Sequence, residues 1–224
     1  MKVAITGKGG VGKTTLASLI PRFYDATAGT VLVDGLDVRE YTFDALYNKL
    51  GYVTQKAVLF SGTVEDNVFF GQSAAEKTDA SLQAALSLSQ AAEFVDKYPE
   101  KAAHPIAQLG RNVSGGQKQR LSIARALART PEILIFDDSF SALDYKTDAV
   151  LREGLAKELP GTTKIIVAQR ISTIRNADQI LVLDRGEIAG LGTHDALMAS
   201  CTVYREIAMS QLSEEELKKG GASK

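Results

Sequence analysis

The sequence predicts an α/β protein with a mainly parallel sheet flanked by helices, and three observations support this prediction. Apolar strand-like runs alternate with helix-like stretches along most of the 224 residues, which is the order typical of parallel sheets. The runs EILIFDD (132–138) and TKIIVAQ (163–169) are almost continuously apolar, as expected of strands that are buried on both faces. At the start of the chain, a short apolar strand leads directly into a glycine-rich loop and a helix.

The N-terminal part of the chain supplies a strand, a helix, a hairpin and a second strand. KVAIT (2–6) has the apolar character of a short strand, and the residues from Lys13 to about Phe23 are predicted to form a helix. Asp34-Gly35 separates two short β-prone segments, which is a strong hairpin signal. LGYVTQ (50–55) is predicted to be the next strand.

The middle of the chain is predicted to be helical. Ser73 and Glu76 have the spacing of a capping box, and alanine-rich helical sequence continues from there to about Gln90. A second helix is predicted for residues 91–98. The segment NVSGGQKQRLSIARALAR (112–129) is a Gly-Gly turn followed by a third helix. These helices interrupt the alternation of strands and helices, so we expect them to form an inserted subdomain.

Near the C-terminal end, QILVLDRGEIAG (179–190) is predicted to form a second hairpin that turns at Arg185-Gly186. The chain is then expected to divide into a nucleotide-hydrolase core (1–71 and 126–211), an inserted helical subdomain (72–125) and a flexible tail (212–224).

The composition excludes several classes of protein. Lys and Arg number 26 against 27 for Asp and Glu, so no basic excess indicates nucleic-acid binding. The single cysteine, Cys201, cannot form an internal disulfide, which suits a reducing compartment. No apolar run approaches the roughly 18 residues of a membrane span, and the residues before Thr6 do not resemble a signal peptide. We therefore expect no direct membrane insertion.

The loop TGKGGVGKTT (6–15) matches the phosphate-binding pattern G-x-x-x-x-G-K-[ST]. Its glycines let backbone N–H groups converge on phosphate oxygens, and the following helix adds its positive end. Lys13 can reach the β- and γ-phosphates, and the Thr14 hydroxyl can bind Mg²⁺. The alternative is a glycine turn that matches by chance. The predicted nucleotide-binding residues are Gly7, Lys8, Gly9, Gly10, Val11, Gly12, Lys13, Thr14 and Thr15.

A second, independent signal is the apolar strand ILIFDD (133–138), which ends in two carboxylates. Asp137 at its end can hold the Mg²⁺ that Thr14 shares. The alternative is a buried strand that is followed by two acidic residues without a metal role, but the phosphate loop in the same chain favours the metal role. The two signals together predict ATP and Mg²⁺ as cofactors.

The residues 112–129 and the following PEILIFDDSFSALD (131–144) closely resemble the nucleotide-binding domain of ABC transporters, which has a P-loop NTPase fold. VSGGQ matches the signature motif of that family, Gln55 in YVTQ matches its Q-loop glutamine, and SALD (141–144) matches its D-loop. The resemblance runs from about Leu16 to Ile207. It is closest to exporter-type domains, through LIPRFYD, LFSGTVEDNV and VAQRISTIRNAD.

This resemblance implies head-to-tail pairing of two nucleotide-binding domains, a transmembrane domain as a further partner, and a cytoplasmic location at the membrane periphery. It also implies that Gln55 acts at the metal and in catalysis. A signature at a helix N-terminus can bind an anion, here ATP held by the partner domain; the alternative is that Ser114 merely caps its helix. The signature residues are Ser114, Gly115, Gly116 and Gln117.

Two residues depart from the family in its catalytic machinery. Asp138 stands where the family usually has a catalytic glutamate, and its side chain is one methylene shorter. A base must lie within hydrogen-bond reach of the attacking water. Gln169 stands where the family usually has the switch histidine, and it cannot carry a positive charge. With Gln55, these are the predicted catalytic residues. The pair resembles the degenerate subunit of heterodimeric exporters; the alternative is that both are tolerated variants with adequate activity.

The phosphate loop is a third departure. GKGGVGKTT resembles the deviant Walker A motif of the Min/Par partitioning ATPases and the nitrogenase iron protein, in which the lysine matching Lys8 reaches a phosphate across a dimer interface. Few residues precede the loop, so the N-terminal antiparallel β subdomain of ABC domains is expected to be truncated. A chimera of two lineages, or an ABC loop that drifted, would explain this.

The predicted function is therefore an ATP-binding and ATPase domain of an ABC exporter with weakened hydrolysis. The alternatives are a free-standing deviant-Walker-A switch and an engineered nucleotide-binding module.

Overall fold

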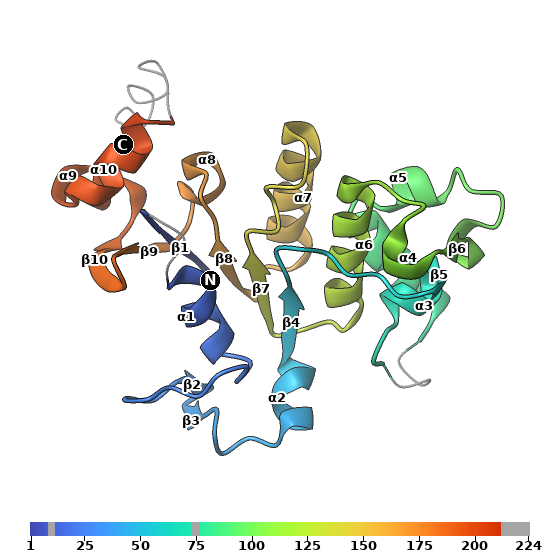
Figure 1. Cartoon of the computed structure of the whole chain (residues 1–224), viewed down its shortest axis with the longest axis horizontal. Coiled ribbons are helices and arrows are strands. Elements are labelled where there is room, and N and C mark those ends of the chain that lie inside the picture. Colours follow the sequence, from blue (N-terminus) through green and yellow to red (C-terminus); the bar gives the residue numbers. More distant parts are fainter. Residues whose placement is uncertain (9–11, 73–76, 212–224) are drawn as a thin grey trace. The chain divides into compact units, whose positions relative to one another are not determined.

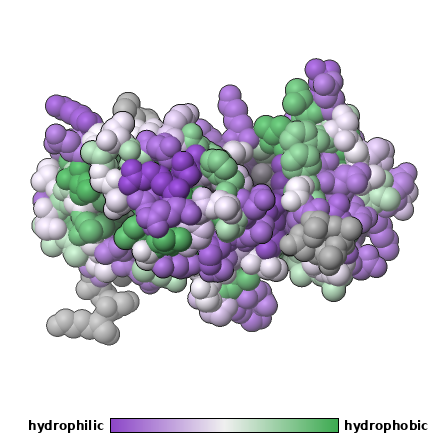
Figure 2. All heavy atoms as spheres, turned by 90° about the horizontal axis from the view of Figure 1, so that it is seen from below, coloured by the Kyte–Doolittle hydropathy of each residue, from purple (hydrophilic) through white to green (hydrophobic). Residues whose placement is uncertain are grey.

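The computed structural model describes residues 1–8, 12–72 and 77–211. They form two compact units, one made of residues 1–46 with those from 163 onwards, the other of residues 47–162. Within the described residues, no helix is both long enough and apolar enough to cross a membrane. Figure 2 shows one face of the molecule, on which hydrophilic side chains predominate and hydrophobic ones gather in separate patches.

The first unit is built around the strand that leads into the phosphate loop. That strand, β1, lies between β8 and β9 and pairs with both in parallel, and β10 pairs antiparallel with β9 (Figure 1). The strands are β1 (Lys2–Lys8), β8 (Thr163–Val167), β9 (Gln179–Asp184), β10 (Glu187–Gly192), and the short pair β2 (Leu32–Val33) and β3 (Leu36–Asp37). Apolar residues such as Ala4, Ile5 and Ile180 are fully or almost fully buried, as the continuous apolar runs predict.

The helices of the first unit are α1 (Lys13–Leu19), α8 (Ile171–Ile174), α9 (His194–Ser200) and α10 (Thr202–Met209). α1 packs on β1 and β8, and α10 packs on α9 and on the strands β1 and β9 (Figure 1). Helix α2 (Phe43–Lys49) spans the boundary between the two units. The C-terminal helix of the described chain therefore lies beside the strand that carries the phosphate loop.

The second unit joins two strands to a group of helices. β4 (Leu50–Val53) pairs in parallel with β7 (Ile133–Asp137). Helix α6 is buried around most of its circumference, with Leu121 and Ile123 on nearly opposite sides, and it packs against α3, α4 and β4. The remaining elements are β5 (Gly62–Thr63), α3 (Val64–Val68), α4 (Asp79–Leu88), α5 (Ala92–Val95), η2 (Lys101–Ala103), β6 (Pro105–Ile106), η3 (Gln108–Gly110), α6 (Gly115–Ala128) and α7 (Tyr145–Glu158).

Both predicted hairpins are confirmed, and their turns have the expected backbone. Asp34 and Gly35 have φ angles of 50° and 80°, and Arg185 and Gly186 have φ angles of 50° and 85°. Two consecutive positive φ angles are the mark of the type I′ turn, which matches the twist of the strands it connects. The predicted strands at 2–6, 50–55, 132–138 and 163–169 are also present, within a few residues of the expected bounds.

Three predicted helix bounds are wrong. α1 ends at Leu19 rather than near Phe23, because Pro21 has no N–H to continue the helical hydrogen bonds. α5 covers only Ala92–Val95 rather than 91–98, because the N–H groups of Lys97 and Tyr98 bond to carbonyls three residues back, as in the tighter 3₁₀ turn. α4 begins at Asp79, where Thr78 and Ser81 form the capping box. The predicted capping box of Ser73 and Glu76 lies outside the described residues, as does the predicted tail.

Candidate nucleotide site

The phosphate loop connects β1, which ends at Lys8, to α1, which begins at Lys13; Gly9, Gly10 and Val11 lie outside the described residues. Gly12 is the N-cap of α1, with a φ angle of 102° and no side chain to cap the first N–H groups of the helix. Those N–H groups and the positive helix end favour an anion at this position.

Gly7 is required by the packing of the sheet. A Cβ atom at Gly7 would lie 1.8 Å from the carbonyl oxygen of Leu183 on β9, and the φ angle of Gly7 is 154°. Both observations exclude a larger side chain without displacement of the backbone. The first glycine of the motif therefore lets β1 and β9 stay paired up to the point where the loop begins.

Lys13 is almost completely buried, and its Nζ donates a hydrogen bond to the carbonyl oxygen of Gly7 at 3.0 Å. Thr14 and Thr15 at the start of α1 are exposed, and the Thr14 carbonyl accepts a hydrogen bond from Ser18 Oγ at 2.7 Å. The lysine ammonium is thus held across the loop, while the two threonine side chains are accessible at the helix start.

A cavity of about 640 Å³ opens at this loop, which is within the range of small-molecule sites. It brings the predicted residues Gly7, Lys8, Lys13 and Gln169 together. Two lysines and an uncapped helix end are the donor set that a phosphate chain needs, so these residues fit the phosphate groups of ATP. The cavity is also lined by four residues of the C-terminal segment, Glu206, Ile207, Ser210 and Gln211.

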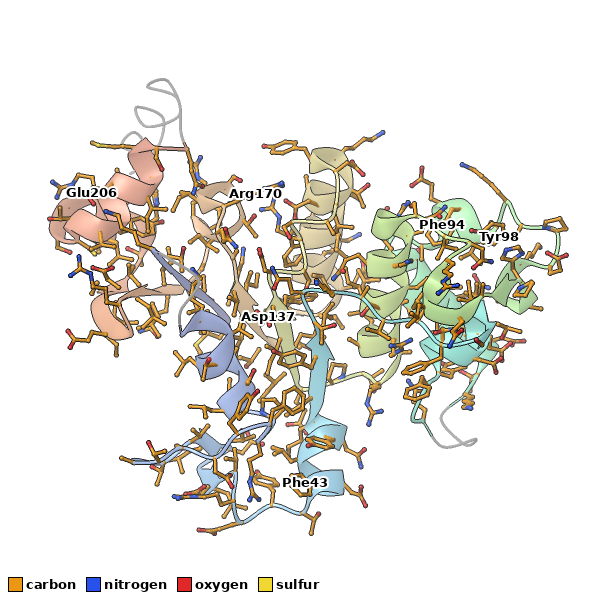
Figure 3. The ribbon with its side chains drawn as sticks, viewed as in Figure 1. Phe43, Phe94, Tyr98, Asp137, Arg170 and Glu206 are labelled. Atoms are coloured by element: carbon orange, nitrogen blue, oxygen red, sulfur yellow. The ribbon has the colours of Figure 1, made fainter. Side chains whose placement is uncertain are left out.

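Sequence reasoning missed these C-terminal residues. Lys8 forms an ion pair with Glu206 on α10, the helix labelled by that residue in Figure 3. Gln211 accepts a hydrogen bond from the Ile171 N–H and donates one to the Gln169 carbonyl oxygen, both at 2.9 Å. Partners 198 and 42 residues apart leave no local pattern in the sequence, so no signal there could have found them.

The two carboxylates at the end of β7 belong to Asp137, labelled in Figure 3, and to the following residue, Asp138; both residues are part of the second unit. Asp137 is buried, and its Oδ2 accepts a hydrogen bond from the Tyr52 hydroxyl at 3.3 Å. Asp138 has a φ angle of 47°, and its Oδ2 accepts a hydrogen bond from Gln55 Nε2 at 3.3 Å. The structure thus brings together Gln55 and Asp138, two residues that are 83 positions apart in the chain.

The predicted signature residues form the N-terminus of α6. Ser114 is its N-cap; Ser114 Oγ accepts from the Gln117 N–H at 3.3 Å, and Gln117 Oε1 accepts from the Ser114 N–H at 2.8 Å. A Cβ atom at Gly115 would meet nothing within 4 Å. Capping therefore explains Ser114 and Gln117, but the packing gives no reason for a glycine at 115.

Within the described ranges, no group of three His, Cys, Asp or Glu side chains could hold a metal ion by itself. Mg²⁺ that arrives with a nucleotide needs only one or two protein ligands besides the phosphates. The hydroxyl of Thr14 and the carboxylate of Asp137 have the oxygen chemistry that Mg²⁺ prefers.

The sequence profile described as "ABC transporter" matches residues 1–141. The chain is 49% identical over 209 residues to an uncharacterized ABC transporter ATP-binding protein of Mycobacterium tuberculosis, and 42% identical over 215 residues to the ATP-dependent lipid A-core flippase of Syntrophus aciditrophicus. These alignments cover 93% and 96% of this chain, but only 36% and 35% of the relatives. The chain thus spans about a third of their length.

Among solved structures, a bacterial Atm1-family ABC exporter with ATP bound matches with a TM-score of 0.89 and 38% identity. The match covers 95% of this chain and 37% of that protein. The α/β P-loop NTPase fold is therefore confirmed. The chain belongs to the ABC transporter family, as an ATP-binding domain with exporter-type homologues, and such domains are P-loop ATPases that bind ATP with Mg²⁺.

Proposed function

We propose that this chain is the ATP-binding domain of an ABC exporter and that its own site hydrolyses ATP slowly. The single observation that carries the second part is the environment of Asp138. Its carboxylate accepts a hydrogen bond from Gln55 Nε2, and its backbone is in the left-handed region. A short side chain whose carboxylate already accepts a hydrogen bond from Gln55 is poorly placed to reach an attacking water.

The size of this effect follows from the missing methylene group. An aspartate carboxylate lies about 1.5 Å nearer the backbone than a glutamate carboxylate, and a displacement of about 1 Å can reduce a catalysed rate about 10²-fold. Gln169 adds to the loss because a neutral amide stabilises the developing charge on the γ-phosphate less than a protonated imidazole would. Gln169 is exposed at the cavity that holds the phosphate loop.

In this proposal the other predicted site residues keep the roles that the sequence predicts for them. Lys13 and the loop bind the phosphates, and Thr14, Asp137 and Gln55 supply oxygen ligands for Mg²⁺. Ser114 to Gln117 act on ATP held by a second nucleotide-binding domain. The open space at Gly115, the first residue of α6, supports this role, because the packing of the described residues does not require a glycine there, whereas the close approach of a nucleotide would.

The proposed partners are a transmembrane domain and a second nucleotide-binding domain. The named relatives are a lipid A-core flippase and an Atm1-family exporter, and this chain spans about a third of each. We propose that the chain works at the membrane periphery, with residues 1–71 and 126–211 as its catalytic core and 72–125 as its signature subdomain.

No observation favours the alternative functions. Lys8 pairs with Glu206 of its own chain, whereas a partitioning-type switch needs that lysine in a neighbouring subunit. The family match begins at residue 1 and includes the phosphate loop, so the origin of the loop in a second lineage stays a hypothesis.

The test is steady-state ATP hydrolysis by the wild type, Asp138→Glu, Gln169→His and the double variant, at several protein concentrations. We expect slow wild-type turnover and a gain of about 10- to 100-fold in the double variant. Gly115→Ala in the double variant tests the signature role. It should fold normally, because a Cβ atom there meets none of the described residues beyond its own helix within 4 Å, and it should lose the gained activity. Brisk wild-type turnover that the double substitution leaves unchanged would contradict the proposal.

A further inference from the structure

Helix α10 (Thr202–Met209) and the two residues after it bring one negative charge to the phosphate cavity. Tyr204 and Ala208 on one side of the helix are fully buried. Glu206, labelled in Figure 3, lies on another side of the helix. It lines the cavity together with Ile207, Ser210 and Gln211. A carboxylate is an unfavourable neighbour for a triphosphate, so its presence at a phosphate-binding cavity requires an explanation.

The structure provides Lys8 as the partner of this carboxylate. Lys8 Nζ donates to Glu206 Oε2, and the two side chains are 48% and 53% exposed. An ion pair of this exposure is weak and exchanges readily with solvent and with other anions. Lys8 also lines the cavity beside Lys13. It therefore stands between two anionic partners, Glu206 on one side and any phosphate group in the cavity on the other.

We propose that Glu206 sets the affinity of the site for ATP by competing with the phosphates for Lys8. This inference rests on the proposed ATP site. When the triphosphate binds, Lys8 leaves Glu206 and pairs with a phosphate oxygen. The energy of the broken Lys8–Glu206 ion pair therefore makes ATP binding weaker than it would be without Glu206. Glu206 is thus a positioning residue, because it acts on the nucleotide through Lys8 and holds the loop lysine against the C-terminal helix.

Two simpler explanations make different predictions. If the pair is only a surface contact, removal of the Glu206 charge leaves ATP affinity unchanged. If Glu206 acts only by repelling phosphates, removal of its charge tightens ATP binding equally with or without Lys8. Competition alone makes the gain depend on Lys8, because only a lysine that is released can be transferred to the nucleotide.

The experiment is a double-mutant cycle of Mg-ATP dissociation constants, measured by calorimetry at low ionic strength with the full chain. The variants are Glu206→Gln, Lys8→Met and both together. Glu187→Gln is the matched control, because this exposed carboxylate on β10 removes the same charge without lining the cavity. Thermal unfolding of each variant establishes that it is folded. Should Glu206→Gln fail to fold, Glu206→Ser replaces it in the cycle.

We expect Glu206→Gln to lower the dissociation constant about two- to fivefold, as an exposed pair allows, and the gain to shrink clearly in the Lys8→Met background. Glu187→Gln should have no comparable effect. An unchanged or weaker affinity in Glu206→Gln would overturn the inference, and so would an equal gain in both Lys8 backgrounds. If neither the wild type nor any variant binds ATP, the proposed function is overturned, and this inference with it. That outcome differs from the affinity changes named above, which would overturn the inference alone.

Discussion

Alanine at Gly7 is expected to destabilise the protein more than a surface substitution would. The added Cβ atom would lie 1.8 Å from the Leu183 carbonyl oxygen and 2.8 Å from the Leu183 carbonyl carbon. Cβ atoms do not approach other atoms closer than 3.0 Å, so the two backbones must separate. Gly7 is directly paired with Leu183 in the parallel ladder, and the separation therefore weakens the central strand pair of the first unit.

Two contributions set the magnitude. A residue with a side chain at a φ angle of 154° costs about 1–3 kcal/mol, and overpacking against backbone costs about 1–3 kcal/mol more. We expect the free energy of unfolding to fall by about 2–6 kcal/mol, a large part of the roughly 5–15 kcal/mol that holds a typical domain folded.

The assay is urea denaturation of the wild type, Gly7→Ala and Gly161→Ala. Gly161 is the matched control, since a Cβ atom there meets nothing within 4 Å and its φ angle is ordinary; its change should stay within about 0.5 kcal/mol. Equal stability of the two variants would refute the account of Gly7 as a packing requirement.

Two further predictions concern the C-terminal part of the first unit. Gln211→Ala removes both hydrogen bonds to Gln169 and Ile171 and should lower the free energy of unfolding by about 1 kcal/mol; urea denaturation that finds Gln211→Ala as stable as the wild type would contradict this. Burial lowers the pKa of His194 below the ordinary value of 6.5, so the unfolded chain binds the proton more readily. The contribution of neutral His194 to stability is present above pH 6.5 and is lost as the pH falls through the folded pKa. The fall in unfolding free energy between pH 7.5 and pH 5.5 should therefore be smaller in His194→Gln, and equal falls would contradict this.

Local signals in the sequence were sufficient for the strands and turns. The type I′ turns at Asp34-Gly35 and Arg185-Gly186 require positive φ angles at consecutive residues, and few residue pairs supply them. Ser114 and Gln117 form a helix cap, which is the alternative to a signature role for Ser114. These features depend on a few neighbouring residues, so the sequence alone determines them.

Features that depend on distant residues could not be predicted. The family resemblance predicted that Gln55 and Asp138 belong to one catalytic site, but their hydrogen bond could not be predicted, and neither could the ion pair of Lys8 with Glu206. Both contacts join segments that are far apart in the chain. The need for glycine at position 7 arises from Leu183 on a neighbouring strand. The early end of α1 is a different case, because Pro21 was a visible local signal for it.

The central claim is that the chain binds Mg-ATP through its phosphate loop and hydrolyses it slowly because of Asp138. The most direct measurement mixes the chain in excess with radiolabelled Mg-ATP and follows bound nucleotide and released phosphate over time, for the wild type and for Asp138→Glu. The account predicts that the wild type retains intact ATP long after binding is complete, while Asp138→Glu releases phosphate about 10- to 100-fold faster. Failure to bind ATP, or rapid phosphate release that is the same in both proteins, would contradict it.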